Sequence, residues 1–147
     1  NTGNCSIANN TGNCSIANTT GNNSVASNIG NYSVASNTGN NSVANNSGFK
    51  SVASNTGNYS IANNTGYCSM SNTTGNNSVA SNFGVTGKAA GKKGNWLVLT
   101  EWELNKNNKL EIKEVKSIKV DGEKIKENMY YSLENGEFVE KGMVEYD

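Results

Sequence analysis

The chain has 147 residues, its twelve lysines balance twelve acidic residues, and it contains no histidine, arginine or proline. The lack of histidine excludes a Ser-His-Asp triad or a histidine base, and zero net charge gives no field that would attract nucleic acid or an anionic membrane. No stretch approaches the roughly 18–20 apolar residues that span a bilayer, and no signal peptide is visible. We therefore expect no nucleic-acid partner and no membrane insertion.

The charges divide the chain into two segments. Every acidic residue lies at or after Glu101, and Lys50 is the one charged side chain before Lys88. An uncharged array rich in Asn, Ser, Gly and Thr is thus followed by a tail of ordinary globular composition. The chain opens on the first position of a repeat and without Met, so we expect it to be a fragment or a processed product.

From Asn1 to Ser81 the chain repeats the phrase Asn-Thr-Gly-Asn-x-Ser-Val/Ile-Ala-Ser/Asn nine times. A period this short is not suited to a globular core, but it suits a stack in which each unit buries one face against the next. A glycine recurs at the third position of every unit, and we predict that these glycines are structural turn residues. They are Gly3, Gly12, Gly21, Gly30, Gly39, Gly48, Gly57, Gly66, Gly75 and a tenth, Gly84.

Each unit reads as one turn and one short strand. Asn-Thr-Gly-Asn is turn chemistry in which Gly supplies a positive φ, and x-Ser-Val-Ala-Ser suits a strand of four or five residues. Two units give an 18-residue coil with two facing strands. Coils stacked at about 4.8 Å would form four to five turns of a parallel β-solenoid, about 22 Å long. A triangular coil of three units is the alternative, and the handedness stays open.

The interior of the coil has two candidate linings. Position five holds Tyr32, Lys50 and Tyr59, which a thin coil does not accommodate, so alternation along the strand places positions five and seven outside and Ser and Ala inside. The alternative is a kinked strand with Val and Ile as the core. In the first arrangement, position seven forms two apolar ladders on opposite faces, which are candidate oligomer seams. They are Ile7, Val25, Val43, Ile61 and Val79 on one face, and Ile16, Val34, Val52 and Met70 on the other.

Two polar series also follow the repeat. Asn recurs at positions one and four, and stacked Asn side chains would hydrogen-bond to one another along the axis. A thread of threonines occupies position two in most units, where a regular surface could bind ice or glycan. It consists of Thr2, Thr11, Thr20, Thr38, Thr56, Thr65 and Thr74.

The chemistry-bearing residues are few. Cys5, Cys14 and Cys68 all occupy the variable fifth position, and their odd number argues against a disulfide framework, so we interpret them as fillers, with pairing between chains as the alternative. The repeats lack the carboxylates that paired-acid catalysis or calcium binding requires. No glycine-rich phosphate motif precedes a helix. We predict no catalytic residue, no metal and no cofactor, and therefore no enzyme.

The tail predicts a small cap. Residues 1–87 are assigned to the solenoid, 88–94 to a Gly/Lys-rich junction and 95–147 to an antiparallel β-meander that shields the end of the stack. Strands are expected over 95–104, 110–120 with a bulge near Glu114, 129–133 and 137–140, and Asp121-Gly122 and Asn135-Gly136 are hairpin signals. The two tryptophans with Tyr130 and Tyr131 form the cap core or line a ligand site.

Two family resemblances are carried by particular motifs. Gly-Asn-Asn-Ser-Val-Ala, at 21–26, 39–44 and 75–80, is similar to the head repeats of trimeric autotransporter adhesins, which build β-rolls packed as trimers. Those heads repeat at seven or fourteen residues and carry Ile-Gly after Ala. The Asn-Thr-Gly-Asn-Tyr-Ser units, followed by Gly94 to Glu101 and Val115 to Lys126, resemble uncharacterised phage and prophage proteins of gut bacteria. That resemblance implies a phage-linked bacterial source and no assigned activity.

Together these observations favour a non-enzymatic structural or interaction protein: a rigid solenoid rod or adhesive surface, with itself as the main partner and a surface glycan or protein as another. A virion or bacterial cell surface is the favoured location, with the cytoplasm as the alternative. Two other functions stay open. The first is end-to-end assembly into filaments, because the repeat lacks charged gatekeepers. The second is the binding of a ligand, a glycan or ice.

Overall fold

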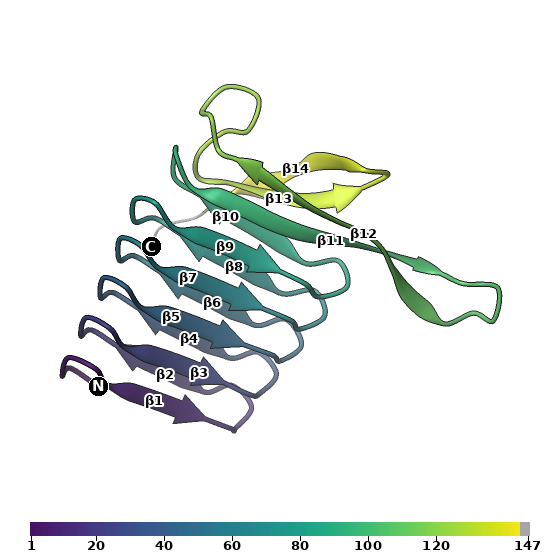
Figure 1. The fold of residues 1–147 in the computed structure, drawn as a ribbon. Coiled ribbons are helices and arrows are strands. Elements are labelled where there is room, and N and C mark those ends of the chain that lie inside the picture. Colours follow the sequence, from purple (N-terminus) through teal and green to yellow (C-terminus); the bar gives the residue numbers. More distant parts are fainter. Residues whose placement is uncertain (145–147) are drawn as a thin grey trace.

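The computed structural model describes residues 1–144 and is all β, with fourteen strands in two seven-stranded sheets (Figure 1). The first sheet contains β1 (Ile7–Asn10), β3 (Val25–Asn28), β5 (Val43–Asn46), β7 (Ile61–Asn64), β9 (Val79–Asn82), β11 (Trp96–Leu104) and β12 (Leu110–Lys119). The second contains β2 (Ile16–Thr19), β4 (Val34–Asn37), β6 (Val52–Asn55), β8 (Met70–Thr73), β10 (Lys88–Gly91), β13 (Met129–Glu134) and β14 (Glu137–Met143). The last three residues of the predicted cap lie outside the described part.

The repeats form a parallel β-solenoid with two nonapeptide units per coil, as predicted. Ile7 pairs with Val25, and Val25 pairs with Val43, so each strand aligns with the strand two units later. The same register joins Ile16 to Val34 in the second sheet. About five coils stack in this way (Figure 1), and the triangular alternative is wrong because successive strands alternate between two sheets.

Small and polar side chains fill the interior. The alanines at position eight have almost no exposure from Ala17 through Ala62 and form one cluster, and the position-six serines are buried from Ser24 onward. The position-seven residues point outward, so the kinked-strand alternative with a Val/Ile core is wrong. An alanine-lined interior buries little apolar surface, so the column depends on hydrogen bonds and close packing.

Buried asparagines at position one join the two halves of a coil. Asn55 is fully buried; its Nδ2 donates to the carbonyl of Ser42 at 3.0 Å, and its Oδ1 accepts from the backbone N–H of Gly57 at 3.0 Å. Position-four asparagines act along the axis instead: the backbone N–H of Asn76 donates to Oδ1 of Asn58 at 2.7 Å. The predicted amide ladder is therefore corrected, because the bonds run between side chain and backbone.

The turn glycines lie in bends before the strands, but they do not supply the positive φ. That conformation belongs to position five, where φ lies near +55° at Cys5 and Tyr32 and at the eight other equivalent residues. A Cβ on Gly57 would instead lie 1.8 Å from the carbonyl oxygen of Gly39 in the coil below. Glycine recurs because backbones of neighbouring coils meet there.

The parallel ladder continues past the predicted boundary at residue 87. Lys88–Gly91, expected in a junction, form β10 and pair with β8, and Trp96 pairs with Val79. Asn95 replaces the serine of the next coil, because its Oδ1 accepts from the backbone N–H of Ser78 at 3.0 Å. The register of the solenoid thus continues directly into the cap.

The cap consists of two hairpins, one extending each sheet. β11 pairs with β12 around the predicted bulge, which falls at Lys113, and β13 pairs with β14 through the predicted Asn135-Gly136 turn. The hairpin expected at Asp121-Gly122 is wrong: this segment begins a loop that crosses from the first sheet to the second (Figure 1).

Larger side chains fill the space between the two cap hairpins. The core contains Leu97, Leu99, Val120 and Tyr131, the last only 1% exposed. Neither tryptophan belongs to it, since Trp96 continues the outer face and Trp102 lies at the rim. Burial of these side chains gives the C-terminal end a core of larger apolar groups than the alanine cluster of the repeats.

Candidate interaction surfaces

The outer face of the first sheet carries the first predicted ladder. Ile7, Val25, Val43, Ile61 and Val79 follow one another in register, and Trp96 extends the row onto the cap. Their side chains are exposed or half-buried, with Ile7 at 62%. Because no charged residue lies in β1, β3, β5, β7 or β9, this face carries an apolar row on an uncharged surface. We name it the first ladder face.

The second predicted ladder lies on the opposite face, in β2, β4, β6 and β8. Ile16, Val34, Val52 and Met70 are in register, and the next residue in the row is Lys88. A groove of about 450 Å³ borders Met70, Lys50 and Lys88. The two predicted ladders therefore both form, but the second ends at a charge.

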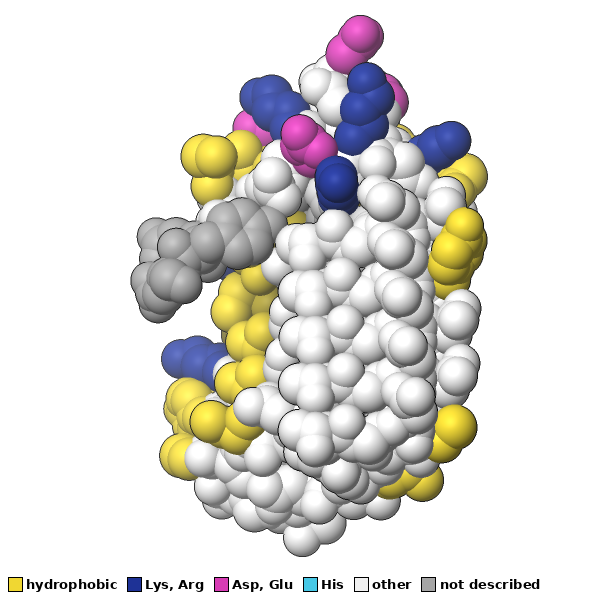
Figure 2. All heavy atoms as spheres, turned by 90° about the vertical axis from the view of Figure 1, so that its left-hand side faces the viewer, with side chains coloured by type: hydrophobic (Ala, Val, Ile, Leu, Met, Phe, Trp, Pro, Cys, Tyr) yellow, Lys and Arg dark blue, Asp and Glu magenta, His cyan; other side chains and the backbone are white. Residues whose placement is uncertain are grey.

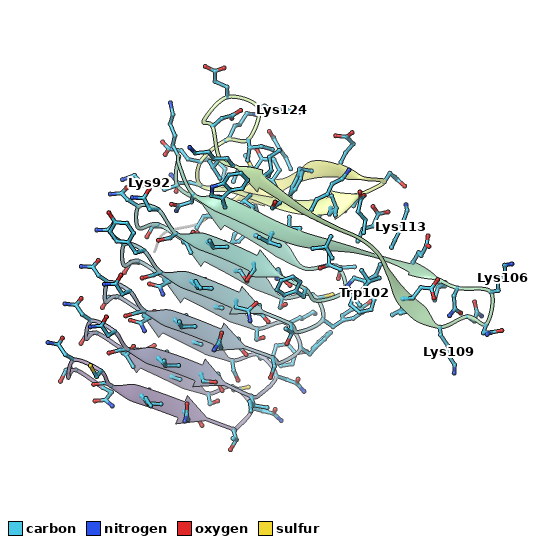
Figure 3. All side chains as sticks on the ribbon, viewed as in Figure 1. Lys92, Trp102, Lys106, Lys109, Lys113 and Lys124 are labelled. Atoms are coloured by element: carbon cyan, nitrogen blue, oxygen red, sulfur yellow. The ribbon has the colours of Figure 1, made fainter. Side chains whose placement is uncertain are left out.

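The turns at one edge of the solenoid, which lead into the odd-numbered strands, form the threonine edge. The two-unit coil splits the predicted thread of seven, and five members share this edge: Thr2, Thr20, Thr38, Thr56 and Thr74. Figure 2 looks onto it and shows regular columns of side chains that are mostly neither hydrophobic nor charged. Lys92 marks its upper end (Figure 3), where its backbone N–H donates to the carbonyl of Thr73.

The opposite turns form an aromatic edge that sequence analysis missed. The Phe49 and Tyr67 rings stack with centroids 5.9 Å apart, and Tyr32 meets Phe49 edge-on at 5.6 Å. The Nζ of Lys50 lies 5.3 Å from the Phe49 ring centroid. Because positions four and five of alternate units stack on one another, reading the chain in pairs of units would have revealed this column.

An ion-pair network joins the two cap hairpins. The Glu101 carboxylate accepts from Lys113 Nζ at 2.6 Å and from the backbone N–H of Gly136, in the β13–β14 turn, at 2.8 Å. The hydrogen bond from Lys113, followed by that from Gly136, holds the pKa of Glu101 below its usual value. Lys116 Nζ donates to the carbonyl of Gly136 at 2.6 Å, so β12 binds the same turn.

Other cap carboxylates are likewise engaged. Glu134 pairs with Lys141 at 2.6 Å and Glu140 with Lys126 at 2.9 Å. The hydrogen bond from Lys141 is the main cause that lowers the pKa of Glu134. These carboxylates are arranged as structural ion pairs rather than as a pair of acids flanking a cleft.

The three cysteines are free thiols in the turns. Cys5 lies on the threonine edge, while Cys14 and Cys68 lie on the aromatic edge. Within residues 1–144 there is no group of three or more His, Cys, Asp or Glu side chains that could hold a metal ion.

No helical segment of the described chain has the length and apolarity needed to cross a bilayer. Comparison of the sequence with protein-family models and with curated proteins finds no match, and comparison with solved structures finds none either.

Proposed function

We propose that the protein is a non-enzymatic structural scaffold: a rigid β-solenoid rod that associates laterally with copies of itself and displays uncharged surfaces. The observation that carries this proposal is the outward position of the Val/Ile ladders. Apolar rows of this kind normally mark an interaction surface on a water-soluble protein. The resemblance to phage and prophage proteins supports a place on a virion or a bacterial surface.

Rigidity follows from how the coils are joined. Each coil is tied to the next by parallel backbone pairing, by serine ladders such as the Ser42 N–H to Ser60 Oγ bond at 3.0 Å, and by the position-four asparagines. Bending the rod would stretch these bonds together on one side. A spacer or display platform requires this resistance to bending.

The first ladder face is the stronger seam. It runs over five strands without a charge, whereas the second ladder reaches Lys88, whose desolvation in an interface would cost free energy. Two such faces share the same axial repeat of about 4.8 Å, so the ladder of one copy matches the ladder of another over its whole length. A two-fold arrangement would use one surface on both copies.

Isosteric substitutions test the seam. Val25, Val43 and Val79→Thr keep β-branched side chains but add hydroxyls to the first ladder face. We expect the triple variant to raise the Kd of self-association by about tenfold or more in analytical ultracentrifugation. The matched control is the double variant Val34 and Val52→Thr on the opposite face, which should change the Kd of self-association little. A wild-type protein that stays strictly monomeric at high concentration would contradict the proposed seam.

A second candidate function is recognition of a regular surface, such as a glycan or ice, by the threonine edge. Its support is the unbroken column of five threonines flanked by Asn4, Asn22 and their equivalents. Glycan-array and thermal-hysteresis measurements test this second candidate function. The absence of glycan binding together with the absence of thermal hysteresis would contradict it. End-to-end filament growth has less support, because the cap hairpins cover β9 and β10 at the C-terminal end.

A further inference from the structure

A cleft of about 300 Å³ lies between the cap hairpins and the last turn of the aromatic edge. It arises because the cap strands run past the ends of the strands they pair with. β11 loses its parallel partner at Leu99, where β9 ends, and β13 pairs with β10 at Tyr131 before it continues to Glu134. Residues 85–87, in the turn that leads into β10, line the space beneath these two overhanging strands.

One wall of the cleft is aromatic. Trp102 is half-buried, and its Nε1–H donates to the carbonyl of Phe83 at 3.1 Å, which fixes the orientation of the indole ring. Figure 3 shows Trp102 where the β11–β12 hairpin leaves the body of the protein. Val85 and Leu133 add apolar surface to the cleft. An aromatic ring held in place in this way offers a flat apolar platform for a ligand.

The facing wall supplies a hydrogen-bond acceptor. Glu134 Oε1 accepts from Lys141 Nζ at 2.6 Å and from Ser132 Oγ at 2.8 Å. Both of these bonds use the same oxygen, so Oε2 is available for a donor such as a ligand hydroxyl. Glu101 is not a second free acid of this cleft, because both of its oxygens are already bound within the protein.

One hydroxyl in the cleft wall lacks a partner. Thr100 lines the cleft and is only 5% exposed, and its Oγ1 makes no hydrogen bond within the described residues. Buried hydroxyls are normally hydrogen-bonded, because burial without a partner costs free energy. A ligand hydroxyl that bonds to Oγ1 removes this cost. Thr100 therefore points to a ligand independently of the aromatic wall and the carboxylate.

We propose that this cleft binds one neutral sugar ring at the end of a glycan. Trp102 stacks on the C–H face of the ring, while Glu134 and Thr100 hydrogen-bond to its hydroxyl groups. A single ring fits because the volume lies at the lower end of the range of small-molecule sites. A neutral ligand fits because the Glu134 carboxylate repels an acidic sugar, while Lys141 already balances its charge against a cation.

The cleft is separate from the seam on the first ladder face and from the threonine edge. It uses the cap and the last turn of one copy, so a monomer contains the whole site. Laterally associated rods would carry one such cleft at the cap end of each copy. A failure of lateral association therefore leaves the sugar-binding proposal standing, and the reverse also holds.

Titration of the full chain with simple sugars tests the proposal. The probes are the methyl glycosides of glucose, galactose, mannose and N-acetylglucosamine, followed by saturation-transfer NMR. We expect at least one to bind with a Kd in the millimolar range, and Trp102→Ala to raise that Kd by about tenfold or more. Trp96→Ala, on the outer face of the same strand, is the matched control and should leave the Kd unchanged. No binding of any of the probes, or an unchanged Kd in Trp102→Ala, would overturn the proposal.

A second variant, Thr100→Val, separates binding from folding. It keeps the shape of the side chain and removes the unpartnered hydroxyl, so the free energy of unfolding in urea should stay the same or rise. The Kd of the sugar should nevertheless rise by about fivefold, a combination that a merely structural role would not produce. Thr65→Val, exposed at the aromatic edge, is the control and should change both quantities little.

Two results would overturn the assignment of the site. The first is an unchanged Kd in Thr100→Val. The second is sugar binding that persists in Trp102→Ala and disappears when Thr38 and Thr56 are both replaced by Val, because the sugar would then bind the threonine edge.

Discussion

Replacement of Gly57 by Ala tests the reason for the nine-residue period. The φ of Gly57 is not in the left-handed region, so Ala meets no conformational penalty there. Its Cβ, however, would lie 1.8 Å from the carbonyl oxygen of Gly39, whereas real Cβ contacts are essentially never below 3.0 Å. The obstructing atom belongs to the backbone and has no side-chain freedom to move away. The two coils must therefore separate locally until the distance from the Cβ to this oxygen reaches at least 3.0 Å.

That separation would break the hydrogen bonds on either side of the glycine. The Thr56 N–H donates to the Asn37 carbonyl at 2.9 Å, and the Asn58 N–H donates to Asn40 Oδ1 at 2.8 Å. Each such bond contributes about 1 kcal/mol, and each buried group left unpaired costs about 1–3 kcal/mol. We expect Gly57→Ala to lower the free energy of unfolding by about 3–5 kcal/mol.

Gly12 supplies the matched control, because it occupies the same repeat position in the first coil. A Cβ there would find its nearest atom at 3.8 Å. Gly12→Ala should change stability little, or raise it by up to about 1 kcal/mol through the lower entropy of the unfolded chain. Urea unfolding followed by circular dichroism compares the two variants. Equal effects of the two substitutions would refute the close-approach argument.

Three further changes have defined outcomes. Asn55→Ala removes three hydrogen bonds of a fully buried side chain and should lower the unfolding free energy by about 2–5 kcal/mol in urea unfolding, against about 1 kcal/mol for Asn58→Ala, which removes one exposed bond. Tyr59 has φ 53°, so Tyr59→Asn should stabilise the protein by about 0.5–1 kcal/mol in the same assay; an unchanged or lower value would contradict the left-handed strain. Because the folded-state pKa of Glu101 is lowered, its contribution to stability is present above the pKa of the unfolded chain and is lost as pH falls through the lowered value. Acid should therefore weaken hydrogen-exchange protection of the cap before that of the repeats, and Glu101→Gln should reduce the difference.

The strands and the two-unit coil could be predicted because the same turn-and-strand pattern recurs in nine successive units. Nearly every unit has one β-branched residue among small ones at a fixed position, so the strand was clear and the open question was which of its side chains face the interior. The bulk of Tyr32 and Tyr59 at position five indicated that the small side chains lie inside. The bulge at Lys113 and the turn at Asn135-Gly136 were also readable, since each is set by local alternation or turn chemistry.

Contacts between neighbouring coils were harder to predict from the sequence. The requirement for glycine arises from backbone one full coil away, and the positive φ falls on position five, which accepts Asn, Cys, Tyr and Lys alike. Sequence preference at a single position does not reveal either cause. The aromatic edge escaped for a related reason, since Tyr32, Phe49 and Tyr67 occupy two different positions of the nonapeptide and meet only through the coil.

The end of the solenoid was misplaced because β10 keeps the strand geometry without the repeat phrase. Lys88–Gly91 lack the serine and the β-branched residue, yet the ladder from β8 holds them in register. At Asp121-Gly122, the apolar residues Val120 and Ile125 enter the core between the two sheets, so the chain crosses over instead of turning back. In both segments, tertiary packing determines the backbone conformation, which the local sequence pattern alone does not specify.

Solvent paramagnetic relaxation of methyl groups tests the central claim most directly, namely that alanines line the column and the valines lie outside it. With a soluble paramagnetic probe, at a concentration where the protein is monomeric, the methyls of Val25 and Val43 should relax strongly. Those of Ala26 and Ala44, which have no exposure, should be protected. Protected valines beside exposed alanines would contradict the account.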